Sequence, residues 1–234
     1  MSVLAIIPAA GMGLRMGGDT PKQFLSLEGE PIFVHTLRKF VASDDIDSIL
    51  LGLRAEDIDR AAVEVEREHF GKPVRLVPGG ATRQETVARC LAEAPADTEV
   101  VAVHDAVRPF VELDAIHRVV EAARKEGGAI LGILSVDTVK QVERQNILGT
   151  IPRERIVLAQ TPQAFRYDLL RGAVDRALAE GFIGTDESSL VEREGHKVVV
   201  LMGSDRNIKI TKPSDLPLAR LYIAQEREHI PHDA

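Results

Sequence analysis

The segment IIPAAGMGLRMGGDTPKQF, residues Ile6–Phe24, decides the predicted fold because it joins a buried-strand pattern to a glycine-rich loop. Its first residues belong to the apolar run SVLAIIPA, and the loop that follows contains four glycines and the basic residues Arg15 and Lys22. Small residues let backbone N–H groups approach phosphate oxygens closely. The segment therefore predicts a phosphate-binding loop at the carboxyl end of a strand.

Two common phosphate-loop motifs do not fit this segment. The dinucleotide pattern G-x-G-x-x-G, begun at Gly11, requires a glycine where the chain has Met16. The pattern G-x-x-x-x-G-K-[ST], begun at Gly13, requires a lysine where the chain has Asp19, and an acid there would repel phosphates. A third kind of loop is needed, in which the glycines make room and the two basic side chains supply positive charge.

Apolar runs recur along the chain between segments with helical spacing. The strand-like runs after the first are DSILLGLR, KPVRLVP, TEVVAVHD, GAILGILS and HKVVVLMG. The helical segments are 31–42, 55–70, 82–94, 112–126, 167–180 and 186–194, and a last helix begins near Pro213. This alternation predicts an α/β fold, a Rossmann-like, mainly parallel sheet flanked by helices, in one domain over residues 1–234 with ligands at the carboxyl ends of the strands.

Residues 136–160 break the alternation. Their apolar residues are scattered among many charges, and QNILG near the middle is typical of a turn. We expect a β-hairpin arm that projects from the sheet. Because such an arm cannot bury its apolar side alone, we expect a second subunit, in a homodimer, to cover it.

The composition limits the possible partners and location. The chain has 36 acidic and 29 basic residues, a net charge of −7, which disfavours nucleic acid and anionic membranes as partners. Its one cysteine, Cys90, excludes an internal disulfide and a cysteine-rich zinc site, and its place on the apolar side of a helix predicts a core residue. No apolar run is long enough for a membrane span, and the first run lacks a basic leader, so we expect a cytoplasmic protein.

Six further blocks follow the opening loop in order and carry a family resemblance. They are GGATRQETV, HDAVRPF, VDTVK, AQTPQAF, TDESSLVE and NIKITKPSDL. Together with PAAGMGLRMGGDTPKQF they resemble the 2-C-methyl-D-erythritol 4-phosphate cytidylyltransferases of the non-mevalonate isoprenoid pathway, from about Val3 to Ala219. The resemblance implies a nucleotidyltransferase in which the substrate phosphate attacks the α-phosphorus of CTP. A phosphate monoester is mostly a dianion at neutral pH, so no protein nucleophile is needed.

The resemblance implies roles for residues of the opening loop, of GGATRQETV and of HDAVRPF. Those implied to bind the nucleotide are Pro8, Ala9, Ala10, Gly11, Gly13, Gly79, Gly80, Ala81, Arg83, Thr86 and Ala106. Those implied to act in catalysis are Arg15, Lys22, Asp105 and Lys209. A divalent cation, Mg²⁺, is implied at Asp105 and Asp205. From the residues alone, GGATRQETV also predicts a helix N-terminus capped by Thr82, with Glu85 completing a capping box.

Substrate binding is implied for residues from several blocks, two of them on the arm. The implied substrate-binding residues are Arg108, Thr138, Arg153, Thr161, Thr185 and Lys209. By the resemblance, Thr138 and Arg153 act in the site of the partner subunit, and the nearby Arg155 is an alternative to Arg153. His104 is expected to be a structural hydrogen-bonding residue, because a single histidine has that role more often than a catalytic one.

Two competing functions remain open at the level of sequence. Ribitol-5-phosphate cytidylyltransferases share PKQF and a loop like HDAVRPF, but usually have LAGG where this chain has PAAG. A nucleotide-binding relative without turnover would have lost some of the charged residues Arg15, Lys22, Asp105 and Asp205, and all of them are present. We therefore favour the methylerythritol phosphate substrate and an active enzyme.

Overall fold

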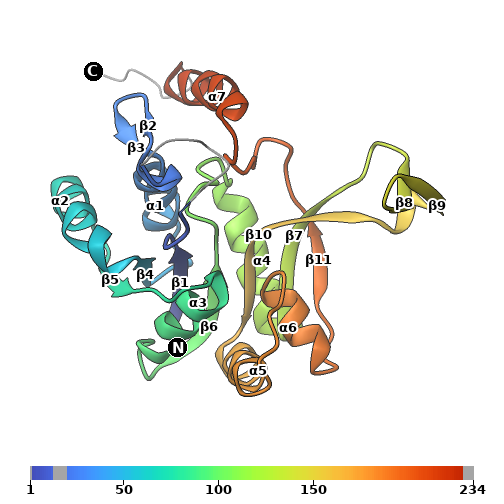
Figure 1. Cartoon of the computed structure of the whole chain (residues 1–234). Helices are drawn as coiled ribbons and strands as arrows, with labels where there is room; N and C mark the ends of the chain where they lie inside the picture. The colour runs from blue at the N-terminus through green and yellow to red at the C-terminus, as the bar shows by residue number, and fades with distance from the viewer. Residues whose placement is uncertain (1, 13–19, 229–234) are drawn as a thin grey trace.

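Seven strands form one central sheet in the computed structural model, which describes residues 2–12 and 20–228 (Figure 1). In their order across the sheet, the strands are β11 (Val199–Met202), β7 (Gly128–Leu134), β10 (Val157–Arg166), β6 (Thr98–Val103), β1 (Ser2–Pro8), β4 (Ser48–Leu53) and β5 (Val74–Pro78). All neighbours pair in parallel except β10, which is antiparallel to β6 and β7. The predicted mainly parallel α/β sheet is confirmed.

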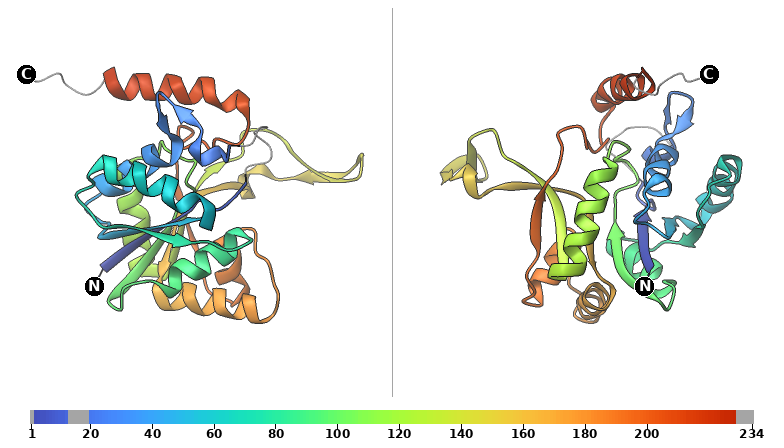
Figure 2. Two further views of the ribbon diagram at one scale, coloured as in Figure 1. Left: turned by 60° about the vertical axis from the view of Figure 1, so that its left-hand side comes forward. Right: turned by 180° about the vertical axis from the view of Figure 1, so that it is seen from behind.

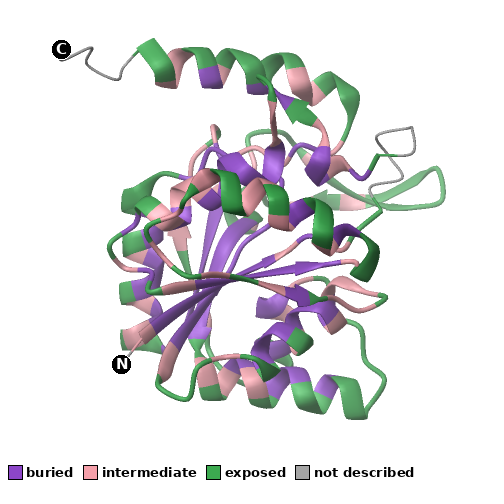
Figure 3. Cartoon of the chain, turned by 90° about the vertical axis from the view of Figure 1, so that its left-hand side faces the viewer, coloured by how far each residue is buried: buried purple, intermediate pink, exposed green. Residues whose placement is uncertain are grey.

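Helices cover both faces of this sheet. One face is packed by α1 (Ile32–Ala42), α2 (Ile58–Glu68) and α4 (Leu113–Glu126), and the other by α3 (Arg83–Ala92), α5 (Tyr167–Ala179) and α6 (Glu187–Arg193). The alternation of side chains along β1 explains why both faces need cover, because Val3 and Ile7 join the first core and Leu4 and Ile6 the second. Figure 3 shows the resulting buried sheet between helices whose outer sides are exposed.

The predicted helices are present at the predicted places. The segment 55–70 begins with the short 3₁₀ helix η3 (Ala55–Asp57) before α2, and the C-terminal helix consists of η5 (Pro213–Asp215) followed by α7 (Leu216–Glu228). The last helix packs beside the small ribbon of β2 (Ser26–Leu27) and β3 (Glu30–Pro31), over a third apolar cluster. Cys90 is buried as predicted, and burial raises the pKa of its thiol to about 12. No helix within the described part of the chain is long and apolar enough to cross a membrane.

The predicted hairpin arm is present as β8 (Val139–Glu143) and β9 (Asn146–Ile151), followed by η4 (Arg153–Arg155). Figure 2 shows it extending away from the rest of the molecule in both views. Its tip turns at Arg144 and Gln145, so only the first residue of the predicted turn QNILG lies in the turn and the other four belong to β9, and Arg144 takes a left-handed φ of 53°. The apolar side chains of Val142, Ile147 and Leu148 on the hairpin are exposed, Ile147 by 63%.

The expected C-terminal boundary of the arm is wrong. The sequence places residues 157–160 in the arm, but they begin β10, whose first residues pair with β7 and whose later residues pair with both β7 and β6. Buried polar side chains such as Gln160, Thr161 and Gln163 weaken the apolar pattern by which a central strand is predicted. The strand AQTPQAF was missed for that reason.

Candidate active site

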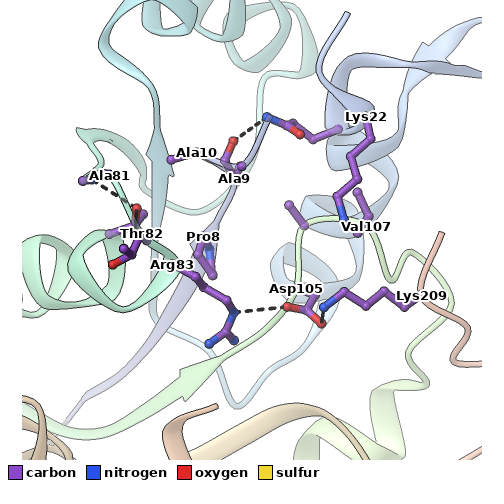
Figure 4. A pocket seen from close by; sticks show the side chains of 15 residues that line it. Pro8, Ala9, Ala10, Lys22, Ala81, Thr82, Arg83, Asp105, Val107 and Lys209 are labelled. Atoms are coloured by element: carbon purple, nitrogen blue, oxygen red, sulfur yellow. Dashed lines mark hydrogen bonds and ion pairs between the residues drawn. The ribbon is translucent and has the colours of Figure 1, made fainter. Parts of the chain in front are cut away.

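The loops that follow β1, β5 and β6 line a cavity of about 130 Å³ (Figure 4). They meet because parallel strands place their carboxyl ends at one edge of the sheet. The cavity is lined by most of the residues predicted to bind the nucleotide or to act in catalysis. These are Pro8, Ala9, Ala10, Gly11, Lys22, Gly80, Ala81, Arg83, Thr86, Asp105, Ala106 and Lys209.

The opening loop is fixed to the sheet at both of its described ends. The N–H of Ala9 donates to the carbonyl of Gly52 at 2.6 Å, and the amide of Gln23, only 2% exposed, donates to the carbonyl of Ala9 at 2.5 Å. Lys22 lies next to Gln23, and its side chain runs along one wall of the cavity (Figure 4). Gly13 and Arg15 lie outside the described residues, so their implied contacts stay predictions.

The segment Gly79–Ala81 approaches the opening loop closely. A Cβ at Gly79 would lie 2.8 Å from the Cβ of Ala10, which is too close, so glycine is required there. The N–H of Gly80 donates to the buried hydroxyl of Thr86 at 3.1 Å. Gly79 does not line the cavity itself, although the residues that follow it do.

The predicted cap of α3 is confirmed in one half and wrong in the other. The hydroxyl of Thr82 accepts from the N–H of Glu85 at 3.1 Å, as an N-cap should. The carboxylate of Glu85, however, accepts from the N–H of Ala81 at 2.8 Å instead of that of Thr82. Glu85 therefore holds the glycine-rich turn as well as the helix.

Asp105, just after β6, is a buried carboxylate of the cavity that contacts three basic side chains. Its carboxylate is only 7% exposed and contacts Lys209 at 2.9 Å, Arg108 at 3.2 Å and Arg83 at 3.4 Å. Burial alone would raise the pKa of Asp105, but these cations outweigh burial and hold the pKa well below its usual range. Asp105 is therefore an ionised carboxylate at neutral pH.

The donor set fits a divalent cation that brings its own further ligands. No group of three or more His, Cys, Asp or Glu side chains that could hold a metal is present among the described residues. Mg²⁺ is commonly bound by one or two carboxylates together with substrate phosphates and water. A single ionised carboxylate in a cavity with a predicted triphosphate loop suits that mode, and the basic side chains on Asp105 would have to move aside.

His104 is a structural residue, as expected, and it supports Asp105. The ring Nε2 lies 2.9 Å from the carbonyl of Arg108, which can only accept, so Nε2 carries the proton and Nδ1 accepts from the hydroxyl of Thr161 at 3.0 Å. The same hydroxyl accepts from the N–H of Asp105 at 3.1 Å. Burial lowers the pKa of His104 to about 4, so the ring is neutral at physiological pH. Thr161 thus fixes the backbone of Asp105, and its hydroxyl is already engaged within the protein.

Asp205 and Arg108 lie on a second cavity, of about 340 Å³, which shares Lys209 with the first. Asp205 itself is exposed and does not line the first cavity with Asp105. The structure thus brings Lys209 and Arg108 to Asp105 but does not bring the two predicted metal carboxylates to one cavity. Arg108 is fixed there by donating to the carbonyl of Asn207 at 2.7 Å.

The predicted arm residues lie together, apart from both cavities. Thr138 and Arg153 line a hollow of about 210 Å³ on the hairpin, whereas Arg155 does not line it. Arg153 also donates to the carbonyl of Val136 at 2.9 Å. Thr185, also predicted to bind substrate, is exposed in the loop before α6 and lines none of these cavities.

Sequence reasoning missed Glu187 near this site. Glu187 is 2% exposed, and its Oε1 accepts from Nη1 of Arg83 at 2.6 Å. Burial alone would lower the pKa of Arg83, but Glu187 and Asp105 raise it above its ordinary value. The block TDESSLVE contained Glu187, but an acid in the first turn of a helix is usually an exposed partner of the helix dipole, and nothing in the pattern indicated burial.

Comparison with known proteins shows the family of the chain. The family model described as 2-C-methyl-D-erythritol 4-phosphate cytidylyltransferase matches residues 3–225. The chain belongs to this family. A family member from Solibacter usitatus is 51% identical over 97% of this chain and 97% of its own length, and one from Acidobacterium capsulatum is 49% identical over 96% and 98%. Both carry the name of the family.

Solved structures of family members have the same fold. The 4-diphosphocytidyl-2C-methyl-D-erythritol synthase of Anaerococcus prevotii superposes with a TM-score of 0.85 at 32% identity, covering 95% of this chain and 96% of that one. The 2-C-methyl-D-erythritol 4-phosphate cytidylyltransferase of Thermus thermophilus has a TM-score of 0.79 at 34% identity, covering 96% and 100%. These findings favour the methylerythritol assignment over the ribitol one.

Proposed function

We propose that this chain converts CTP and 2-C-methyl-D-erythritol 4-phosphate to 4-diphosphocytidyl-2-C-methyl-D-erythritol and pyrophosphate. A phosphate oxygen of the substrate forms a bond to the α-phosphorus of CTP, and the bond from that phosphorus to the bridging β-phosphate oxygen breaks. Family membership supports the reaction. The observation that carries it in this chain is the cavity that joins Lys22, Lys209 and the ionised Asp105 to the small-residue loop after β1.

The residues of the cavity have separate tasks in this reaction. Two anions must come together, so catalysis depends on positioning and on cations that stabilise the charge of the transition state. We assign that stabilisation to Lys22 and Arg15 at the α-phosphate and to Lys209 at the substrate phosphate. The backbone of residues 8–11 and 79–81 leaves room for the triphosphate and the small pyrimidine, because side chains there are short or absent.

We further propose that Mg²⁺ accompanies CTP. Asp105 would hold it by one carboxylate oxygen, and Asp205 is the second carboxylate proposed from the family resemblance. When bound, the cation neutralises phosphate charge in the transition state. The side chains that would have to give way to the cation are those of Lys209, Arg108 and Arg83, which contact Asp105.

The arm supports a proposal about assembly. We propose a homodimer in which Thr138 and Arg153 of the arm contact the methylerythritol phosphate bound to the partner subunit, with Thr185 near the substrate. The exposed apolar side chains of the hairpin, Val142, Ile147 and Leu148, favour a covered surface in the functional assembly. A cytoplasmic location stays a prediction from the single cysteine and the composition.

The test is a pyrophosphate-release assay that crosses two substrates with three nucleotides in the presence of Mg²⁺. We expect turnover with 2-C-methyl-D-erythritol 4-phosphate and CTP, and little with ATP or UTP. Turnover only with ribitol 5-phosphate would reject the proposed substrate. An absence of turnover with every pair, from a protein shown to be folded, would reject the enzyme assignment.

A further inference from the structure

Arg83 lies between two carboxylates and is held unequally by them. Its Nη1 donates to Oε1 of Glu187 at 2.6 Å, whereas its Nε lies 3.4 Å from Oδ1 of Asp105 (Figure 4 shows the Asp105 contact). The first distance is that of a strong charge-assisted hydrogen bond, and the second is at the long limit. The guanidinium is therefore anchored to Glu187 and only loosely tied to Asp105.

Glu187 has capacity for a second bond. Its Oε2 is buried and has no hydrogen-bond partner, which is unfavourable for a carboxylate oxygen. A guanidinium can donate two parallel hydrogen bonds to one carboxylate. Arg83 could satisfy Oε2 by turning away from Asp105 and pairing with both oxygens of Glu187.

The start of α6 is fixed, so Glu187 cannot follow Arg83 into the cavity. The amide of Gln163 donates to Asp186 at 2.8 Å and accepts from the N–H of Ser188 at 3.0 Å, so it holds the residues on both sides of Glu187. The amide of Gln84 binds the preceding loop in the same way, through the N–H of Gly184 and the carbonyl of residue 182. The residues around Glu187 are thus held by hydrogen bonds, whereas the contact of Arg83 with Asp105 is the longer of its two.

We propose that Glu187 is a positioning residue that limits the pairing of Arg83 with Oδ1 of Asp105 and so keeps that carboxylate oxygen available to the divalent cation that accompanies CTP. The inference rests on the proposed function, in which Asp105 takes that cation. If Glu187 were neutral, Asp105 would be the remaining partner of Arg83 and the site would gain one positive charge. Both effects act in the same direction, because each weakens the binding of a divalent cation at Asp105.

The experiment measures how much a metal tightens CTP binding, without the second substrate and therefore without turnover. Calorimetry gives the dissociation constant of CTP in EDTA and again with excess Mn²⁺. The ratio of the EDTA value to the Mn²⁺ value isolates the contribution of the metal from the other contacts of the nucleotide. For Glu187→Gln we expect this ratio to fall by at least about fivefold relative to wild type. Glu192→Gln, the same charge change at an exposed position on the same helix, is the matched control and should leave the ratio unchanged.

A double variant separates positioning from a general structural role. Arg83→Gln combined with Glu187→Gln has the net charge of wild type and lacks the competing guanidinium, so its ratio should return at least to the wild-type value. A ratio that stays as low as in Glu187→Gln alone would overturn the inference, and so would an unchanged ratio in Glu187→Gln.

A third variant covers the case in which Glu187→Gln does not fold. Glu187→Asp keeps the charge on a side chain one methylene shorter, draws Arg83 farther from Asp105 and should give a ratio equal to or above that of wild type. A lower ratio in this variant contradicts the inference. If Mn²⁺ does not tighten CTP binding to the wild-type protein, the proposed metal role of Asp105 fails. If Mn²⁺ tightens CTP binding equally in wild type and in the Glu187 variants, the metal role stands and the inference about Glu187 fails.

Discussion

Replacing His104 by glutamine should remove a defined part of the acid sensitivity of the fold. His104 is fully buried, and its pKa is lowered to about 4 from the ordinary value of 6.5, chiefly by burial. The folded protein therefore keeps the ring neutral at a pH where the unfolded chain has already protonated it. The stability that His104 contributes is complete above about pH 6.5 and is lost progressively as the pH falls toward 4.

The size of the effect follows from the two pKa values. A gap between 6.5 and about 4 corresponds at most to about 3.4 kcal/mol of unfolding free energy. Between about pH 7.5 and about pH 5, the part that is lost is about 2 kcal/mol. His35, whose pKa burial also lowers, acts in the same direction, but it is present in both proteins and cancels from their difference.

The measurement is urea-induced unfolding of wild type and His104→Gln at both pH values. Glutamine has an amide that can still donate to the carbonyl of Arg108, and it does not titrate. We expect the variant to lose about 2 kcal/mol less than wild type on acidification. Any loss of stability from the substitution itself cancels, because only the change between the two pH values is compared. Equal losses in the two proteins would refute the buried, neutral state assigned to His104.

Three further variants test the site and the arm. Lys22→Ala should lower turnover by at least about a hundredfold with an unchanged melting temperature, because it removes a cation from the transition state, and near-normal turnover would disprove its role. Gly79→Ala should cost about 1–3 kcal/mol of unfolding free energy and raise the KM for CTP, because its Cβ would lie 2.8 Å from the Cβ of Ala10. Gly149→Ala, which has open space around the added Cβ, is the control, and equal effects of the two substitutions would contradict the packing argument. Mixed subunits of Arg153→Ala and Lys22→Ala should regain activity if the arm acts across the dimer, and no recovery despite proven subunit exchange would count against it.

The elements with simple periodicity could be predicted from sequence, and β10 could not. The strands such as β1 are continuous apolar runs, and helices such as α3 show both spacing and a capping residue. In β10 the buried side chains include polar ones whose partners, such as the His104 ring and Asp186, are distant in sequence. A pattern in one segment holds no information about a partner elsewhere, so the sequence places residues 157–160 in the arm and does not predict the rest of the strand.

In the candidate active site, too, features with a local sequence pattern could be predicted and features that depend on distant partners could not. The loop residues around Asp105 could be predicted because short motifs at strand ends carry them, and the family resemblance added their proposed roles. The engagement of Thr161 by His104 and the burial of Glu187 depend on how separate elements pack, and neither leaves a local signal. The roles of the site residues, Arg15 and Asp205 included, stay predictions.

The position of β10 also determines the order in which the molecule can be completed during synthesis. About the first half of the chain contains β1, β4, β5 and β6, which pair with one another. The other two strands, β7 and β11, join this set only through β10, which lies between β6 and β7 in the sheet but comes after both of them in the sequence. Until residues 157–166 emerge, β7 has no partner in the first set of strands. Joining the two parts of the sheet also brings the hydroxyl of Thr161 to the N–H of Asp105, so the strand that connects the two parts also fixes the backbone of the cavity's carboxylate.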